Sequence, residues 1–176
     1  PAATGDIVAF RTTRKADYVA GDASAAYGNV KRYVRHVVFS KPDVIVILDD
    51  VEPHVPSTFQ WYLHGLDEFD VRAGDARARL QRKNAGVEIA YLSPLPLRFD
   101  QTSGYKPEPK KKMPTQWHLE TTTTEKRDSI LMLTVLCPYR GNRAPKVDVK
   151  RLESETAVGC EVKIGRDDHL VAFRKP

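Results

Sequence analysis

Residues 44–50 read VIVILDD, an unbroken run of five apolar residues that is closed by two aspartates. The run has the length of one strand, and alternate residues would present apolar side chains to both faces of a sheet. Such a strand is typical of the centre of a sheet that is covered on both sides. We therefore expect residues 44–50 to form a central strand.

Strand patterns continue on both sides of this run. The segment TFQWYLHG (58–65) alternates strictly, which predicts that Trp61 lies on the core face of a strand and that Tyr62 and His64 lie on the opposite face. The other segments of strand type are 5–12, 30–39, 87–93, 96–102, 116–124, 130–137, 146–152, 160–165 and 169–175.

Helix patterns are nearly absent. No convincing stretch of the chain has apolar residues at the i, i+3, i+4 and i+7 spacing of an amphipathic helix, and the best candidate, 75–83, reads equally well as an exposed strand. A parallel sheet needs crossover connections, which are usually helical. The sequence therefore predicts an all-β fold: a single domain over 1–176, built as a large antiparallel β-sandwich of two packed sheets with about a dozen strands.

The composition excludes several classes of protein. The chain has 176 residues, of which 41% are hydrophobic and 29% charged, with a formal net charge of +5. These values suit one folded domain. No apolar run approaches the ~20 residues that span a bilayer, so we expect no membrane partner. The chain begins at Pro1 without a signal-peptide pattern, and we expect it to be the C-terminal fragment of a longer multidomain protein.

Residues that carry catalysis are not found in recognisable arrangements. No two of the five histidines have a metal-ligand spacing, and no C-x-x-C occurs, so we expect no metal and no cofactor. Asp49 and Asp50 are adjacent in a strand and point to opposite faces, so they cannot act together on one bond. We expect one aspartate to cap the following turn and the other to pair with Arg32 or Arg35. We expect no catalytic residue in this chain.

Two segments are candidates for binding a saccharide. The polar face of 58–65 is the first, although a histidine held by backbone hydrogen bonds is the simpler interpretation there. The second is 104–114, GYKPEPKKKMP, whose prolines prevent it from joining a sheet and predict an extended loop with dense positive charge. The candidate substrate-binding residues are Tyr62, His64, Tyr105, Lys110, Lys111 and Lys112.

Five pieces of the first 65 residues resemble a known family when they are taken in order. They are Y-x-x-G-D-A-S-x-A-Y (18–27), R-x-x-R-x-V-x-F (32–39), a turn with proline (42), the apolar run ending in Asp-Asp (44–50), and F-x-W-x-L-H (59–64). Together they resemble the C-terminal β-sandwich of the heparinase II/III-like polysaccharide lyases. The remaining residues agree with that family only in being rich in strands.

The resemblance implies a parent enzyme in which a helical toroid precedes antiparallel sheets. Such enzymes cleave uronic-acid polysaccharides, such as glycosaminoglycans or alginate, by β-elimination. A tyrosine or histidine base removes the C5 proton while neighbouring groups neutralise the carboxylate. The family's catalytic residues and its H-x-D…F…D-x-G metal stretch precede this region, so no catalytic or metal residue is carried over. The resemblance further implies a secreted or periplasmic location and an upstream helical domain as partner. We expect no nucleic-acid partner.

Three functions follow from these observations. The leading one is a C-terminal domain that supports the catalytic region of a lyase, and it leaves open whether the domain also contacts the substrate or a second copy of the chain in a homodimer. The alternative is a freestanding carbohydrate-binding or adhesion module of sandwich fold. The third is a small complete enzyme that uses His64 with Tyr62. The sequence leaves open which polysaccharide is bound and the redox state of Cys137 and Cys160.

Overall fold

The computed structural model describes residues 4–176, and strands dominate this range. The strands are β1 (Asp6–Thr12), β2 (Ala16–Asp22), β3 (Val30–Ser40), β4 (Val44–Pro53), β5 (Gln60–Gly65), β6 (Asp70–Arg72), β7 (Arg77–Arg82), β8 (Ala85–Leu92), β9 (Leu97–Ser103), β10 (Trp117–Thr123), β11 (Ile130–Arg140), β12 (Val147–Glu153), β13 (Ala157–Ile164) and β14 (Asp167–Arg174). The helical elements of this range are two short 3-10 turns, η1 (Ser24–Ala26) and η2 (Ala73–Asp75). The predicted all-β class is confirmed.

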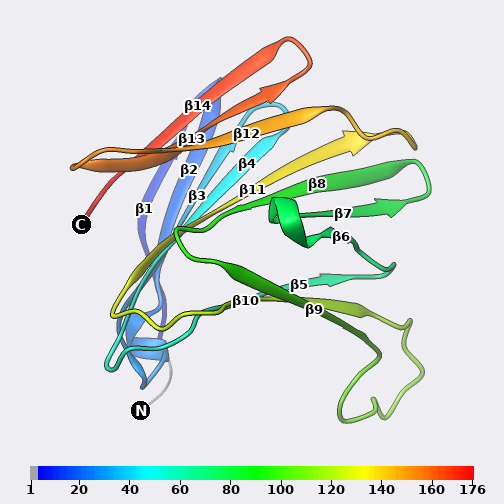
Figure 1. Cartoon of the computed structure of the whole chain (residues 1–176), viewed down its shortest axis with the longest axis horizontal. Helices are drawn as coiled ribbons and strands as arrows, with labels where there is room; N and C mark the ends of the chain where they lie inside the picture. The colour runs from blue at the N-terminus through cyan, green and yellow to red at the C-terminus, as the bar shows by residue number, and fades with distance from the viewer. Residues whose placement is uncertain (1–3) are drawn as a thin grey trace.

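The strands form three antiparallel sheets (Figure 1). The large sheet has the order β1-β2-β3-β4-β11-β8-β7-β6, and the two small sheets are β5-β10-β9 and β12-β13-β14. We expected two packed sheets, whereas the small sheets cover opposite faces of the large one and give three layers. The reason lies in β4, whose apolar residues on both faces each need a cover.

The position of β4 confirms the predicted central strand. It pairs with β3 on one side and with β11 on the other. Val46 and Leu48 are fully buried toward β12–β14, whereas Ile47 packs toward β5-β10-β9. Because successive residues of a strand point to opposite faces, one strand supplies both cores.

The first core, which we call the valine-rich core, lies between the large sheet and β12–β14. Its buried residues are Val44, Val46, Leu48, Ala90, Leu133, Val135, Cys137, Val147, Val158, Cys160, Val162, Val171 and Phe173. Seven of them are valine, which suits strands because its branched side chain packs well on a pleated surface. The only polar atoms in this set are two sulfurs, so the layer is closed to polar chemistry.

The second core, which we call the aromatic core, lies under β5-β10-β9. Trp61 is 7% exposed, which confirms its predicted core position, and its ring meets the edge of Tyr91 at a centroid distance of 5.5 Å. The ring of Tyr91 in turn lies 5.4 Å from that of Phe99. Trp117 is half-buried at the margin of this cluster. Large rings therefore fill this layer, and their edge-on contacts add to its stability.

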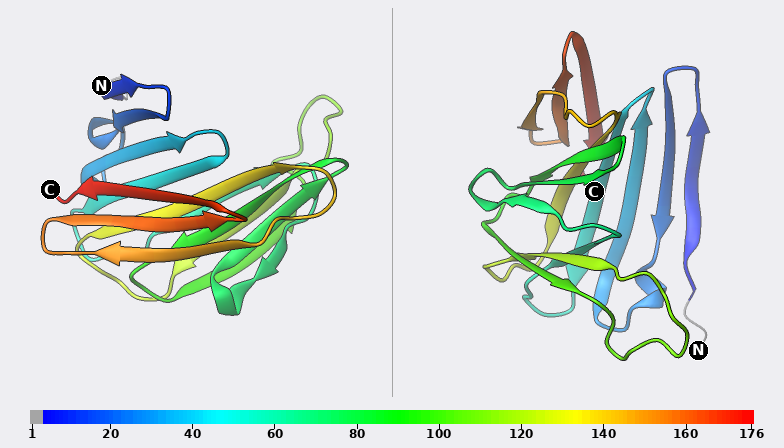
Figure 2. Two further views of the ribbon diagram at one scale, coloured as in Figure 1. Left: turned by 90° about the horizontal axis from the view of Figure 1, so that it is seen from above. Right: turned by 90° about the vertical axis from the view of Figure 1, so that its right-hand side faces the viewer.

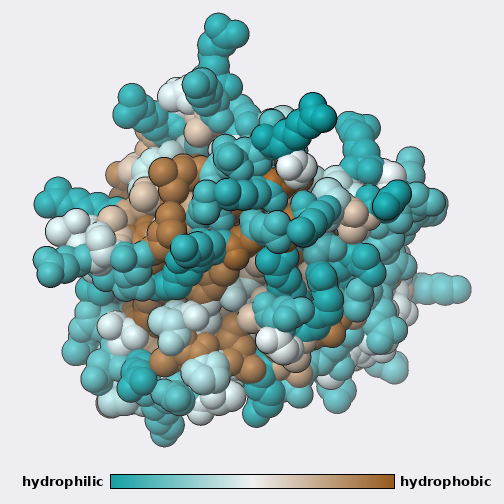
Figure 3. All heavy atoms as spheres, turned by 45° about the horizontal axis from the view of Figure 1, so that its top comes forward, coloured by the Kyte–Doolittle hydropathy of each residue, from teal (hydrophilic) through white to brown (hydrophobic). Residues whose placement is uncertain are grey.

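The large sheet is wider than either of its covers. As a result, β1 lies at an unpaired edge, where Ile7, Val8 and Phe10 are strongly exposed. Figure 2 shows β1 and β2 standing apart from the layers that cover the rest of the sheet. In the face shown in Figure 3, an apolar area lies between charged side chains that dominate elsewhere. Each cover therefore leaves part of the large sheet accessible.

All eleven strands expected from the sequence are present. Two strands, β2 and β6, were not predicted. A third additional strand, β7, falls in the segment 75–83, for which the sequence left a helix and an exposed strand open. The loop after β9 lacks regular structure through residue 116, as its prolines predicted. None of the helical turns in the described range is long or apolar enough to cross a membrane.

Candidate functional site

The outer face of β5-β10-β9, turned away from the aromatic core, carries two of the candidate residues. Tyr62 and His64 alternate with the buried Trp61 along β5, so both side chains point outward and are exposed, as predicted. Their role in binding stays a prediction.

A second histidine completes a pair on this face. β10 pairs with β5 so that His118 lies directly opposite His64, and their Nδ1 atoms are 2.6 Å apart. The two rings meet edge to face at 84°, with centroids 4.7 Å apart. Tyr105 lies next to His118, at a centroid distance of 6.2 Å. Sequence reasoning missed His118 as a partner because 54 residues separate it from His64.

The hydrogen bonds fix where protons sit on the pair. His118 Nε2 lies 2.6 Å from the carbonyl oxygen of Gly104, which can only accept, so this nitrogen carries a proton. When both rings are neutral, His118 Nδ1 is then an acceptor and His64 Nδ1 must donate to it. The Nε2 atom of His64 is left with a free lone pair. This nitrogen can take a proton or accept a hydrogen bond from a hydroxyl group.

Tyr62 does not offer a base at neutral pH. Its hydroxyl donates to Gln60 over 3.2 Å, and Gln60 donates to Glu120 over 2.9 Å. Desolvation and the nearby Glu120 carboxylate raise the pKa of Tyr62 above its usual value. The phenol therefore stays protonated at neutral pH and can act as a donor to a bound saccharide.

The basic loop between β9 and β10 forms a hollow of about 460 Å³. Tyr105, Lys111 and Lys112 line it, and the Tyr105 hydroxyl donates to the carbonyl of Pro114 over 2.9 Å. Lys110 is exposed and lies outside this lining. The structure thus links Tyr105 to the histidine pair, and it places two of the three candidate lysines with Tyr105.

The paired aspartates lie on opposite faces of β4, as predicted. Asp49 faces the aromatic core and accepts from Arg35 Nε at 2.6 Å and Arg35 Nη2 at 3.1 Å, and from Trp61 Nε1 at 3.0 Å. Asp50 faces the other side and accepts from Arg32 at 2.8 Å. We expected one aspartate to cap a turn, but β4 continues to Pro53, so both are mid-strand and both pair with β3.

The Asp49 cluster forms the base of a cleft of about 500 Å³ between β3–β4 and β5. Tyr27 and Tyr62, each about half exposed, reach its rim from opposite sides. Tyr33 also lines it, and burial together with the Asp49 charge raises the pKa of its phenol. Because Asp49 is held by three donors, the cleft offers protonated phenols and no free carboxylate. Within residues 4–176, no group of three or more histidine, cysteine or acidic side chains is arranged to hold a metal.

The layered all-β architecture is shared by solved structures of heparinase III and of a heparan sulfate lyase. One heparinase III has 15% sequence identity and a TM-score of 0.76, and the match covers 97% of this chain and 28% of that chain. A second heparinase III structure has 12% identity and a TM-score of 0.73 over 98% of this chain and 28% of its own. The heparan sulfate lyase HepC from Pedobacter heparinus has 13% identity and a TM-score of 0.70 over 96% and 28%.

These matches confirm the predicted resemblance at the level of the fold. This chain spans 28% of the length of each of those three structures. At 12–15% identity the likeness concerns the fold alone. No family model matches the sequence, and no curated protein is significantly similar to it.

Proposed function

We propose that this chain is the β-sandwich domain of a heparinase II/III-like polysaccharide lyase, in which it supports the catalytic region. The observation that carries the proposal is the match of 97% of the chain, at a TM-score of 0.76, to just over a quarter of a heparinase III. The β-elimination of a uronic-acid polysaccharide, a glycosaminoglycan or alginate, then belongs to the parent enzyme. A secreted or periplasmic location and an upstream helical partner are parts of the same proposal.

The chemistry of the described residues supports a role without independent catalysis. β-Elimination needs a base at C5 and groups that neutralise the uronate carboxylate. Asp49 and Asp50 are already neutralised by arginines, and Tyr62 stays protonated. Among the candidate residues, His64 has a free ring nitrogen, but the cations in this set are the three lysines of the loop beyond Tyr105. We therefore place Tyr62, His64, Tyr105 and the loop lysines in saccharide contact.

Analysis and expression of the complete gene product test this proposal. We expect its reading frame to encode several hundred mostly helical residues before this chain, and the product to release unsaturated uronate from heparan sulfate or alginate. Deleting residues 1–176 is expected to abolish that activity, and adding the purified chain back is expected to restore part of it. A reading frame without such a region, whose product still binds polysaccharide, would favour a freestanding carbohydrate-binding module instead.

A further inference from the structure

A second surface with a distinct charge lies beyond the edge of the valine-rich core. The register places Arg79 of β7, Glu88 of β8 and Cys137 of β11 in one row across the large sheet. Cys137 belongs to the valine-rich core, so Arg79 and Glu88 lie on the same face of the large sheet as this core. They lie beyond the part of that face that β12 covers. The segment 140–147 forms the wall of a hollow there of about 960 Å³.

Positive charge dominates this hollow, which we call the arginine groove. Six cationic side chains line it, against three acidic ones. The cationic residues are Arg72, Arg77, Arg79, Arg140, Arg143 and Lys146. Glu88, whose side chain is only 8% exposed, is the acid at the floor and is neutralised by Arg72 and by Arg79. In residues 4–176, no carboxylate lies within ion-pair distance of Arg140 or Arg143. These two guanidinium groups are available to a ligand.

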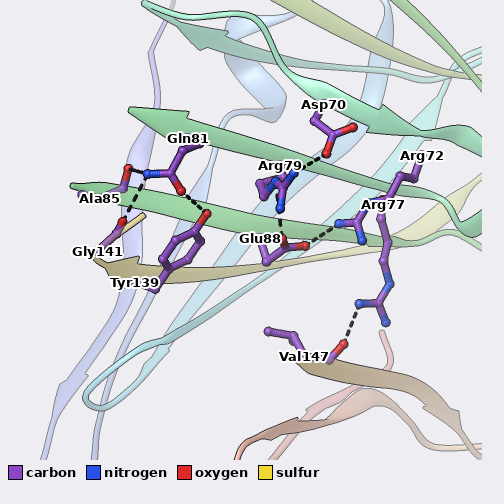
Figure 4. Close-up of polar contacts among 10 residues, drawn as sticks. All are labelled: Asp70, Arg72, Arg77, Arg79, Gln81, Ala85, Glu88, Tyr139, Gly141 and Val147. Atoms are coloured by element: carbon purple, nitrogen blue, oxygen red, sulfur yellow. Dashed lines mark hydrogen bonds and ion pairs between the residues drawn. The ribbon is translucent and has the colours of Figure 1, made fainter. Parts of the chain in front are cut away.

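The floor of the groove is held in place before any ligand binds (Figure 4). Arg79 lies between Glu88 and Asp70, and donates to Asp70 over 2.7 Å. Arg77 donates to the carbonyl of Val147 over 2.6 Å, which ties β7 to the start of β12. The guanidinium groups of Arg77 and Arg79 are therefore held by contacts within the fold before a ligand binds, so less conformational entropy is lost when they bind one.

The wall is fixed to the floor by Gln81 and Tyr139. The Tyr139 hydroxyl donates to Gln81 over 2.6 Å, and Gln81 donates to the carbonyl of Gly141 over 3.2 Å (Figure 4). The Tyr139 ring lies over Gly86, where any Cβ would overlap it. This close approach requires glycine, and it holds the end of β11, at Arg140, against the groove. Arg143 lies in the loop that follows this strand end.

We propose that the arginine groove binds a segment of acidic polysaccharide at a place separate from the outer face with Tyr62 and His64. The inference rests on the proposed function for its class of ligand. Planar guanidinium groups pair with carboxylate and sulfate groups through two parallel hydrogen bonds, which suits a chain that carries such groups at each sugar. The groove lies on the β12 side of the large sheet, whereas Tyr62 and His64 lie beyond the aromatic core on the other side.

The lining favours a sugar chain over a nucleic acid. Single-stranded nucleic acids bind to exposed aromatic faces on which bases stack, in addition to positive charge. The one aromatic residue in the groove is Tyr139, which is half-buried with its hydroxyl engaged by Gln81. Polar and charged groups make up most of the remaining lining, and they match the hydroxyl, carboxylate and sulfate groups of an acidic saccharide.

Binding of defined oligosaccharides to the chain tests the inference. The double variant Arg140→Gln/Arg143→Gln removes two charges that have no native ion-pair partner, so the fold is expected to persist, which the melting temperature checks. The matched control is Arg14→Gln/Arg166→Gln, which removes two exposed, unpaired charges elsewhere. The probes are a heparan sulfate octasaccharide, an alginate octasaccharide and a single-stranded oligodeoxynucleotide, each titrated at about 0.15 M salt.

We expect the groove variant to weaken the Kd for at least one oligosaccharide about tenfold and the control variant to change it less than twofold. Equal binding by the wild-type chain and the groove variant would overturn the inference, and so would no binding of either oligosaccharide. Preferential binding of the oligodeoxynucleotide, lost in the groove variant, would overturn the assignment to a sugar chain. The lyase activity of the complete gene product is measured separately, so failure here is distinguishable from failure of the proposed function.

Discussion

The two faces of the large sheet differ although the same strand supplies both. On one face β4 contributes Val46 and Leu48 to a core whose only heteroatoms are sulfurs. On the other it contributes Ile47 and Asp49 to a core of large rings that opens into a cleft. Each side of β4 has an aspartate paired with an arginine of β3, Asp50 on the valine-rich side and Asp49 on the aromatic side. The sides differ because Asp49 also bonds to a ring of its core, Trp61, and lines a cleft.

The largest effect is expected at Trp61, whose ring joins the aromatic core to the ion pair of Asp49 with Arg35. Trp61→Ala should cost about 3–5 kcal/mol, because it leaves a cavity and removes one donor from Asp49. Tyr62→Ala, at the exposed neighbouring position, should change the melting temperature little. Thermal unfolding of both variants is the measurement. A wild-type melting temperature in Trp61→Ala together with weaker polysaccharide binding would show that Trp61 stacks on sugar instead.

The two adjacent aspartates sharpen the comparison between the faces. Asp49→Asn should cost about 2–3 kcal/mol, because all three of its accepted hydrogen bonds come from groups that keep their protons. Asp50→Asn should cost about 1 kcal/mol or less, because one Asp50 oxygen is buried without a partner and can be replaced by an amide nitrogen. Urea unfolding of the two variants measures the difference. Equal losses would contradict the distinction.

A smaller, pH-dependent effect is expected at the margin of the valine-rich core. His36 Nδ1 and the Tyr18 hydroxyl share a hydrogen bond of 2.8 Å, and the His36 ring packs against Phe173. Burial lowers the pKa of His36 below 6.5, although Asp50 opposes the shift. Below pH 6.5 the unfolded chain therefore binds a proton at His36 more readily than the folded chain does. The free energy of unfolding that neutral His36 contributes at higher pH is lost as the pH falls below 6.5.

Urea midpoints at about pH 7.5 and about pH 5 measure this loss. His36→Gln keeps an acceptor for Tyr18 and should reduce the difference between the two midpoints, whereas His54→Gln in an exposed turn should leave it as in the wild type. An unchanged difference in His36→Gln would rule out His36 as its source.

The reactivity of Cys137 and Cys160 tests whether the valine-rich core is closed, and it is the smallest of the expected effects. Both are free and buried, and burial raises the pKa of Cys137 and of Cys160 to about 12. A thiol reagent such as dithiobis(nitrobenzoate) should leave the folded chain unlabelled and label two thiols per chain in urea. Rapid labelling of the folded chain would show that the valine-rich core opens.

Much of this architecture could be predicted from local patterns. The runs at 44–50 and 58–65 predicted a central strand and a buried Trp61, because alternation over several residues reports which face is covered. β2 was missed because Gly21 and two aspartates weaken its pattern, and β6 because it has three residues. The number of sheets was wrong because apolar side chains show that a face is covered and do not show by which strands.

The candidate sites were predicted less well, since they depend on pairing between distant strands. His118 lies in an alternating segment, but only the register between β5 and β10 shows that it lies opposite His64. The arginine groove combines residues of 72–79, 88 and 139–148, which lie apart in the sequence and meet only through strand pairing. The one local signal was the spacing of Arg77 and Arg79, which puts two cations on one face of a strand.

The most direct test of the central claim is the lyase activity of the chain by itself. The chain is proposed to support a lyase without catalysing, because its carboxylates are paired and Tyr62 stays protonated. Purified chain mixed with heparin, heparan sulfate or alginate should therefore produce no increase in the ultraviolet absorbance of unsaturated uronate. A steady increase that is abolished by Tyr62→Phe or by His64→Ala would contradict the account and assign catalysis to the outer face of β5-β10-β9.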